Sequence, residues 1–217
     1  MHIFFSHDRN KTEVEEDQLE NLITKNPLAL KAIFESDNEA QKRQTLILLK
    51  NLVSRKPSAV QLLAQAYQSA RFSVDYLREE SQKNPDKYLR TFAGSLMILA
   101  SCYRDEGNLE ESLKNIIEAV EIRKYLYQKN PEIFTPTLAG TLNSLSAAYS
   151  NVGKYENALD ATKEAIELYR TLTESDPLKY KPILRGTLYC LAACYKYFDK
   201  NNEAKNAMDE AASLVRE

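Results

Sequence analysis

A 46-residue period runs through the last two thirds of the chain and constrains its fold more than any other feature. Asparagine or aspartate followed by proline recurs at Asn84-Pro85, Asn130-Pro131 and Asp176-Pro177, with no insertion between copies. A chain with such a period is a stack of similar units, each of which buries its apolar face against its neighbours. The same spacing relates Gly94, Gly140 and Gly186, then Tyr103, Tyr149 and Tyr195, and then Ala119, Ala165 and Ala211.

Each unit predicts two helices. The first has apolar residues at helical intervals, such as Leu142 and Leu145, and stops at a glycine such as Gly153, which enters a left-handed turn at little cost. The second is expected over residues 155–173 of the middle unit, and proline then closes the unit. Pro136 and Pro182 are expected in the first turn of the next helix. The predicted buried side of the second helix carries Ala158, Leu159, Thr162, Ala165, Ile166 and Leu168.

Small residues stand at fixed places of both helices, where closely packed helices cross. They are Ala100, Ser146 and Ala192 in the first helices and Ser112, Ala158 and Ala204 in the second. With the aligned tyrosine, glycine and alanine positions, they resemble the tetratricopeptide repeat family, which has a 34-residue core. Residues 139–172 match that pattern, and LNSLSAAYSNVGKYENAL (142–159) resembles the longer repeats of kinesin-light-chain-like proteins. The resemblance implies an all-α fold, a right-handed superhelical α-solenoid of antiparallel helix pairs.

The period divides the chain into unequal parts. Residues 12–83 are helical in pattern but out of register, with helices expected over 28–35, 39–54 and 58–82 after an initial one that Pro27 stops. The predicted division is a tail (1–11), N-terminal capping helices (12–37), a divergent helix pair that is a candidate first repeat (38–83), two repeats (84–129 and 130–175) and a degenerate C-terminal repeat (176–217). MHIFF at the start is expected in the tail, with a docking strand or an apolar plug as alternatives.

The last repeat departs from the pattern at Asp199, Asn201 and Lys205, and its second helix is shorter than the earlier ones. Solenoid ends need a polar cover. Either this helix is polar enough to serve as one, or an interface or a further part of a longer chain covers it.

Charge and hydropathy exclude several classes of partner. The formal net charge is −2 with acidic and basic residues interspersed, so we expect no nucleic-acid ligand. No run approaches the roughly 20 apolar residues of a membrane span, and the start lacks the pattern of a secretory signal. Three cysteines within helical patterns, Cys102, Cys190 and Cys194, form no disulfide framework. We therefore expect a cytoplasmic protein with no membrane contact.

Candidate chemistry is sparse. His2 and His7 are the only histidines, so a cysteine nucleophile would lack a nearby activating base. Cys190 and Cys194 lie one helical turn apart, but structural zinc needs four ligands, and both are expected to be buried small hydrophobes. No phosphate-binding glycine loop or hydrolase motif occurs. The sequence predicts no enzyme, no cofactor and no metal site.

The resemblance places the binding surface on the inner wall formed by the first helices of successive repeats. Its predicted residues are Met97, Arg104 and Asp105 in one repeat, Asn143, Ser150 and Asn151 in the next, and Tyr189, Lys196 and Tyr197 in the last. In kinesin-light-chain-like repeats the asparagine of LNxL binds a peptide backbone, and here Asn143 alone holds that place. The clamp for carboxylate tails found in other family members is missing. A mixed apolar and basic groove is therefore expected, suited to a peptide or helix of a partner protein.

These features together predict a scaffold or adaptor that binds another protein in its groove. The convex face, the open end and the amino-terminal helices are alternative binding surfaces. A regulatory receptor for a short signalling peptide is one alternative function. An assembly subunit that self-associates through its C-terminal end, and so forms a homo-oligomer, is the other.

Overall fold

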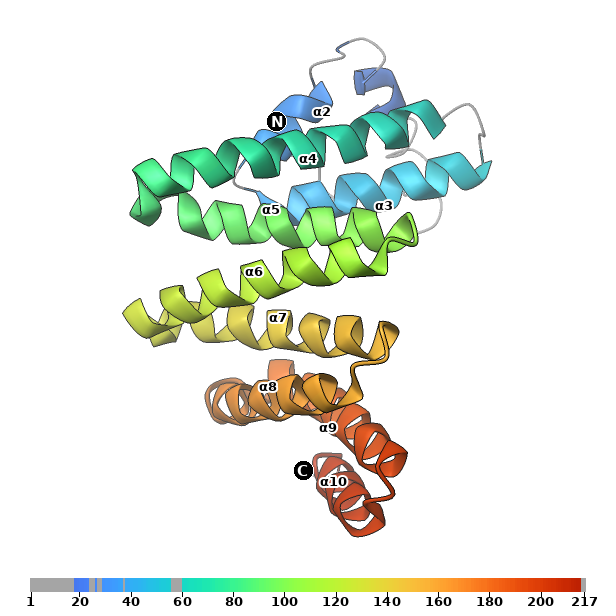
Figure 1. The fold of residues 1–217 in the computed structure, drawn as a ribbon, viewed down its shortest axis with the longest axis vertical. Coiled ribbons are helices and arrows are strands. Elements are labelled where there is room, and N and C mark those ends of the chain that lie inside the picture. The colour runs from blue at the N-terminus through green and yellow to red at the C-terminus, as the bar shows by residue number, and fades with distance from the viewer. Residues whose placement is uncertain (1–17, 24–25, 27–28, 37, 56–59, 216–217) are drawn as a thin grey trace. The chain divides into compact units, whose positions relative to one another are not determined.

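The computed structural model describes residues 18–23, 26, 29–36, 38–55 and 60–215, and every regular element within these ranges is a helix (Figure 1). The chain divides into two compact units, residues 1–102 and 103–217. The first contains helical residues 18–23 and the elements α2 (Ala29–Glu35), α3 (Glu39–Arg55), α4 (Val60–Lys83) and most of α5 (Pro85–Asp105). The second contains α6 (Leu109–Lys129), α7 (Pro131–Asn151), α8 (Tyr155–Ser175), α9 (Pro177–Tyr197) and α10 (Asn201–Ser213).

The predicted helices are confirmed, and their ends differ from expectation by one or two residues. The helices predicted over 28–35, 39–54 and 58–82 are α2, α3 and α4, and the one predicted over 155–173 is α8. Within the second unit each helix packs against the next along the chain, from α6 to α10. This is the helix-pair architecture of an α-solenoid, as expected. MHIFF, His2 and His7 lie outside the described residues.

A single residue joins one repeat to the next. The backbone N–H of Asn130 donates to the Leu126 carbonyl at the end of α6 (3.0 Å), and its side-chain oxygen accepts from the Ile133 N–H at the start of α7 (3.3 Å). Asp176 caps α8 and α9 in the same way. Because one residue satisfies backbone groups of both helices, the chain reverses direction without a loop.

The expectation for the two inner prolines is wrong. α7 begins at Pro131 and α9 at Pro177, so Pro136 and Pro182 lie inside the helices rather than in their first turns. A proline there removes one helical hydrogen bond to the residue four positions earlier. For Pro136 that residue is Glu132, which is exposed, so water can solvate its carbonyl group.

The turn inside each helix pair needs a left-handed residue. Gly107 and Gly153 have φ angles of 78° and 75°, and Asp199 takes the same place in the last repeat with φ 56°. Aspartate tolerates this region better than most residues because its short polar side chain can bond locally. The degenerate repeat therefore keeps the turn geometry without the glycine.

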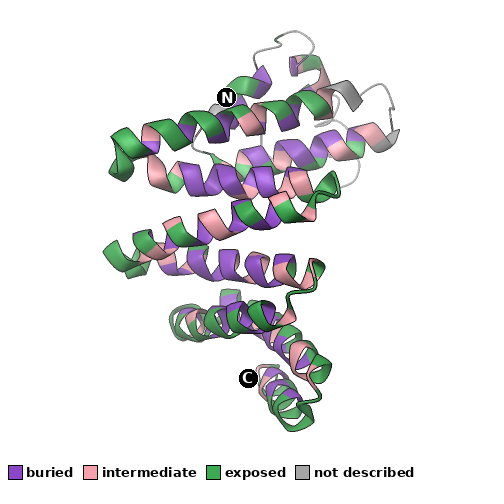
Figure 2. Ribbon diagram, viewed as in Figure 1, coloured by how far each residue is buried: buried purple, intermediate pink, exposed green. Residues whose placement is uncertain are grey.

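The six small residues predicted at the helix crossings are all buried. Ser146 of α7 and Thr162 of α8 are both buried, and their hydroxyl oxygens lie 2.6 Å apart. Figure 2 shows buried residues along most of α7, while α10 is exposed over much of its surface. On α8, Leu168 is half-buried rather than buried, but the other five residues predicted for its buried side are buried.

Two ion pairs repeat in register on the second helices. Lys124 of α6 lies 2.8 Å from Glu164 of α8, and Arg170 of α8 lies 2.8 Å from Glu210 of α10. Arg170 and Glu210 stand 46 residues after Lys124 and Glu164, so these are the same pair in successive repeats. The hydrogen bond to Glu210 is the main reason that the pKa of Arg170 is raised above its ordinary value.

In the first unit, buried polar groups join α3, α4 and α5. The ammonium of Lys42, which is 2% exposed, donates to the hydroxyl of Ser95 at 2.9 Å. The hydroxyl of Ser73, also buried, donates to the Phe34 carbonyl of α2 at 2.8 Å. The hydroxyl oxygens of Ser73 and Ser95 lie 3.5 Å apart and link α4 to α5. Buried polar groups are tolerated only when hydrogen-bonded, so these contacts hold the four helices together.

Candidate functional site

The first helices of two consecutive repeats are linked in the second unit. The Nδ2 of Asn143 on α7 donates to the hydroxyl of Thr187 on α9 at 3.0 Å, and that hydroxyl donates to the Ile183 carbonyl at 3.0 Å. Within the described part of the chain, the Asn143 Oδ1 accepts no hydrogen bond. Asn143 thus gives one of its two N–H donors to the neighbouring repeat and retains the other N–H and the Oδ1.

One face of α9 is unusually open. Ile183, Tyr189 and Tyr197 are 39%, 48% and 60% exposed, and Lys196 is exposed beside them. Tyr189, Lys196 and Tyr197 lie along one side of the helix because they are seven and eight residues apart. Tyr197 contacts two other rings: Tyr155 with ring centroids 4.0 Å apart, and Phe198 in an edge-to-face arrangement at 5.2 Å. The helix therefore presents exposed aromatic surface beside one cation.

The other predicted residues lie in different settings. Ser150 is half-buried, and its hydroxyl donates to the carbonyl of Ser146 on its own helix at 3.0 Å, whereas Asn151 is exposed at the end of α7. Arg104 and Asp105, at the end of α5, are exposed, and the Arg104 Nη2 lies 3.8 Å from the Asp105 Oδ1. Met97 is half-buried in the first unit. Asn143, Ser150 and Asn151 thus share α7, and Tyr189, Lys196 and Tyr197 share the hydrogen-bonded helix α9.

The expectation that Cys190 and Cys194 are buried is wrong. Cys190 is exposed and Cys194 is half-buried, while Cys102 is buried. Their spacing of seven and three residues from the exposed Tyr197 places both cysteines on the same side of α9 as that ring. Partial burial, with a smaller effect of neighbouring Cys190, raises the pKa of the Cys194 thiol.

Metal-ligating side chains do not gather in the described ranges, where no group of three or more His, Cys, Asp or Glu residues could hold an ion. Among the helices that the structure describes, none combines the length and apolar character needed to cross a membrane.

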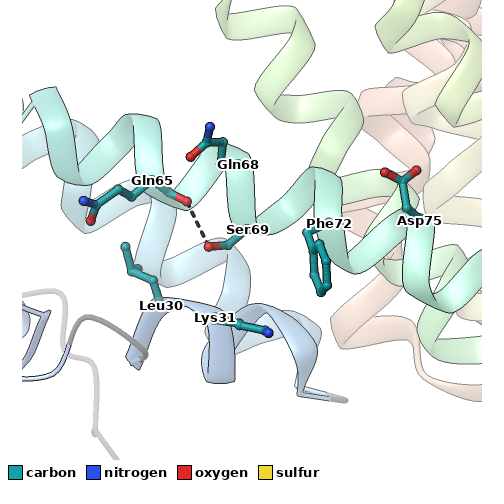
Figure 3. Close-up of a pocket in the computed structure, with 7 residues that line it drawn as sticks. All are labelled: Leu30, Lys31, Gln65, Gln68, Ser69, Phe72 and Asp75. Atoms are coloured by element: carbon teal, nitrogen blue, oxygen red, sulfur yellow. Dashed lines mark hydrogen bonds between the residues drawn. The ribbon is translucent and has the colours of Figure 1, made fainter.

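A concave pocket lies between α2 and α4 in the first unit (Figure 3). Its volume is about 480 Å³, within the range of ligand pockets. Leu30 forms a buried part of its wall, and the ammonium of Lys31 lies 4.8 Å from the centroid of the exposed Phe72 ring. The lining residues are Leu30, Lys31, Gln65, Gln68, Ser69, Phe72 and Asp75.

The sequence did not predict this pocket, although the end of α4 at Asn84 allows that helix to be aligned with the second helices of the later repeats. Counted back from the asparagine or aspartate that ends each repeat, Phe72 occupies the position of Glu118, Glu164 and Glu210. An aromatic residue at a position that is otherwise glutamate marks a change in surroundings.

Two family models match the chain. The model described as tetratricopeptide repeat matches residues 138–177. The model described as anaphase-promoting complex subunit 5 matches residues 45–130 and 178–217, which is more than half of the chain. No curated protein matches the chain in sequence.

Several solved structures are similar in fold. BtubC (BKLC) from P. vanneervenii has 16% sequence identity and a TM-score of 0.55, with 95% of this chain and 89% of that chain covered. MamA has 14% identity and a TM-score of 0.50, covering 99% and 97%. A putative kinesin light chain with TPR-like repeats from Podosopora anserina has 14% identity and a TM-score of 0.48, covering 97% of each chain. At sequence identities this low, the similarity to BtubC and MamA shows that the fold is shared and nothing more.

Proposed function

Because the chain is a tetratricopeptide-repeat protein and belongs to the family described as anaphase-promoting complex subunit 5, we propose that it is a non-catalytic scaffold that binds a peptide or helix of a partner protein. The binding surface is the one formed by α7 and α9. Tetratricopeptide repeats serve protein interaction, and the residues of this chain supply no catalytic constellation.

The open face of α9 is the observation that carries the proposal. Tyrosine is enriched where proteins bind one another because its ring contributes apolar area and its hydroxyl a hydrogen bond. Tyr189, 48% exposed, offers both, and no other described residue pairs with it. Lys196 is exposed and forms no ion pair with any residue that the structure describes. A partner segment with an apolar side chain over Tyr189 and a carboxylate near Lys196 satisfies both residues.

The polar groups of α7 favour a folded or helical segment over a fully extended peptide. An extended peptide presents backbone donors and acceptors at every residue, and these require repeated side-chain partners. Asn143 retains one N–H of its Nδ2 and its Oδ1, which suffice for one backbone residue, and Met97 and Tyr189 stand at the equivalent places of the other repeats. A helix satisfies its own backbone and needs only side-chain contacts. We therefore place a helical segment first among the partners.

The family is named for a subunit of a complex, which supports binding to a partner within a permanent assembly. Self-association through the C-terminal end is less favoured. Asn202, Lys205 and Asp209 of α10 are exposed polar residues, which suits a polar cover, although Met208 is 41% exposed among them. A receptor for a signalling peptide would use the same α7 and α9 surface.

Affinity capture with a matched pair of variants tests the proposal. The test variant, Tyr189→Ala with Lys196→Glu, removes the exposed ring and reverses the charge on α9. The control, Tyr125→Ala with Lys205→Glu, makes the same changes on α6 and α10, where Tyr125 is 42% exposed. Partners recovered from a lysate are compared by quantitative mass spectrometry after circular dichroism shows that both variants are folded.

We expect partners that the wild type and the control retain and that the test variant loses by about tenfold or more, the loss typical of central interface residues. Peptides scanned across such a partner should bind the wild-type chain directly. Equal recovery by both folded variants would place the binding surface elsewhere and refute the proposal for α7 and α9.

A further inference from the structure

One stripe of the second helices is buried in two repeats and exposed in the last. The buried residues, all at most 7% exposed, are Leu113, Ile116, Val120 and Arg123 in α6 and Leu159, Thr162, Ile166 and Tyr169 in α8. Their spacing of three, four and three residues places them on one side of each helix. The equivalent residues of the last repeat, all exposed, are Lys205, Met208, Ala212 and Val215. Met208 is 41% and Val215 is 60% exposed.

In the earlier repeats the first helix of the following repeat covers this stripe. Arg123 of α6 donates to the Thr137 carbonyl of α7 at 3.1 Å. The rings of Tyr169 on α8 and Tyr180 on α9 have centroids 6.4 Å apart. Val215 stands at the position of Arg123 and Tyr169. Among the elements that the structure describes, none follows α10, so no first helix lies against its stripe.

The following first helix also contacts the first helix before it. α9 does so through the hydrogen bond from Asn143 of α7 to Thr187. Tyr189 stands at the position of Asn143, so it lies toward the place of a further first helix. Arg185 and Lys196, four residues before Tyr189 and seven after it, share that side of α9. Because α9 contacts both α7 and α8, a helix in the equivalent place would contact both α9 and α10.

This surface, which we name the end face, is apolar and basic. Its residues are Arg185, Tyr189 and Lys196 of α9 with Met208, Ala212 and Val215 of the last repeat. α9 has no acidic residue over Pro177–Tyr197. Arg185 is half-buried and Lys196 is exposed, and neither forms an ion pair with a described residue. The two cations of α9 are therefore available to carboxylates of a partner.

The charges that border the end face leave its sign positive. Two pairs of opposite charge are adjacent or one helical turn apart at the border: Asp199 with Lys200, and Lys205 with Asp209. Each pair offsets itself, and charges at a border mainly affect the rate of association. Glu203 and Glu210 lie on the opposite side of α10 from Met208. Most exposed residues of α10 are polar, and its exposed apolar residues gather on the end face.

We propose that the end face takes an acidic amphipathic helix of a partner protein, in the place that the first helix of a further repeat would occupy. Apolar residues of that helix cover Met208, Val215 and the ring of Tyr189. Its carboxylates pair with Arg185 and Lys196. A second copy of this chain fits less well, since its end face would bring the same two cations. The proposal rests on the proposed function, because it uses Tyr189 and Lys196, and adds α10 and the chemistry of the partner.

Direct binding to the full chain tests the end face. The probe is a fluorescein-labelled helical peptide of about 18 residues, five turns, built from leucine, alanine and glutamate with the leucines on one face. A second peptide carries lysine in place of every glutamate. The formal net charge of the chain is −2, so general attraction favours the lysine peptide. Fluorescence anisotropy is nevertheless expected to show saturable binding of the glutamate peptide, at least about tenfold tighter than that of the lysine peptide.

Matched variants locate the bound peptide. Met208→Glu should weaken the glutamate peptide by about tenfold or more, because it removes apolar surface and adds a repelling charge. Asn206→Glu makes the same change of charge on the opposite, exposed side of α10 and should change affinity less than about twofold. Arg185→Glu should also weaken binding by about tenfold, and Arg90→Glu, at an exposed position of α5, is its control. Circular dichroism checks that each variant is folded.

Three results would overturn the proposal. The first is no saturable binding of the glutamate peptide by the wild-type chain. The second is equal weakening by Met208→Glu and Asn206→Glu. The third comes from light scattering at several concentrations: if the wild type dimerises and Met208→Glu does not, a second copy covers the end face and no partner helix is required. The capture experiment with Tyr189→Ala and Lys196→Glu is read separately, so the proposed function can hold where the end face fails.

Discussion

The hydrogen bond between Asn143 and Thr187 offers a sharp test of how the α7 and α9 surface is built. Its donor and acceptor are 3.0 Å apart, Thr187 is 4% exposed, and Asn143 is half-buried. A neutral hydrogen bond contributes about 0.5–1.5 kcal/mol. In Asn143→Ala the Thr187 hydroxyl keeps its bond to the Ile183 carbonyl at 3.0 Å, so no buried hydroxyl loses all its partners. We expect a loss of about 1 kcal/mol.

A double-mutant cycle measures this bond. Urea unfolding of the wild type, Asn143→Ala, Thr187→Val and the double variant gives the coupling free energy, which we expect at about 0.5–1 kcal/mol. The melting temperature of Asn143→Ala should fall by roughly 2–4 °C for a chain of this size. Additive effects, with coupling below about 0.3 kcal/mol, would refute a stabilising role for the bond.

The same variants show whether Asn143 contacts a partner directly or only holds α7 beside α9. If the Asn143 Oδ1 accepts a hydrogen bond from a partner, Asn143→Ala should weaken partner capture more than Thr187→Val does, although both break the bond between the helices. Equal weakening would mean that Asn143 acts only by holding α7 beside α9. That result would remove Asn143 from the binding surface while leaving Tyr189 on it.

Three further predictions concern backbone, charge and thiols. Gly153→Ala should destabilise the protein by about 0.5–1 kcal/mol in urea unfolding, because left-handed strain exceeds the entropy gained; Asp199→Gly should stay within about 0.5 kcal/mol of the wild type, and the reverse ranking would refute the argument. Glu210→Gln, which breaks the ion pair with α8, should cost at most about 1 kcal/mol, an effect that vanishes in high salt. Iodoacetamide should modify exposed Cys190 before Cys194, whose raised pKa moves its alkylation to higher pH; equal rates measured by mass spectrometry would contradict this.

The helices could be predicted from the sequence because their ends carry local signals. Asn130 and Asp176 each cap two helices with their own backbone and side-chain atoms, so the junction depends on residues adjacent in sequence. The turn at Gly153 requires a left-handed residue at one position. Such signals need no knowledge of the remaining fold. The prediction that Pro136 lies in a first turn was wrong because proline commonly marks a helix start, whereas α7 had already begun at Pro131.

The orientation of side chains on α9 could not be predicted as well. Cys190 follows a helical apolar pattern, and small sulfur-containing residues are most often buried. Its exposure depends on which side of α9 the adjacent helices cover, and that is a property of their packing rather than of the local sequence. Tyr189 was assigned to the surface through the family resemblance, and its 48% exposure agrees with that assignment.

The strongest functional signals in this chain lie where a repeat breaks its own register. At the position of Glu164 and Glu210, glutamate is explained by the basic partner on the preceding helix. Phe72 stands at that position with the ammonium of Lys31, on α2, 4.8 Å from its ring centroid. A degenerate repeat that merely lost its neighbour would be expected to become polar, as the exposed side of α10 largely is. Phe72 is instead aromatic and 53% exposed, and Tyr76, one turn further along α4, is 46% exposed.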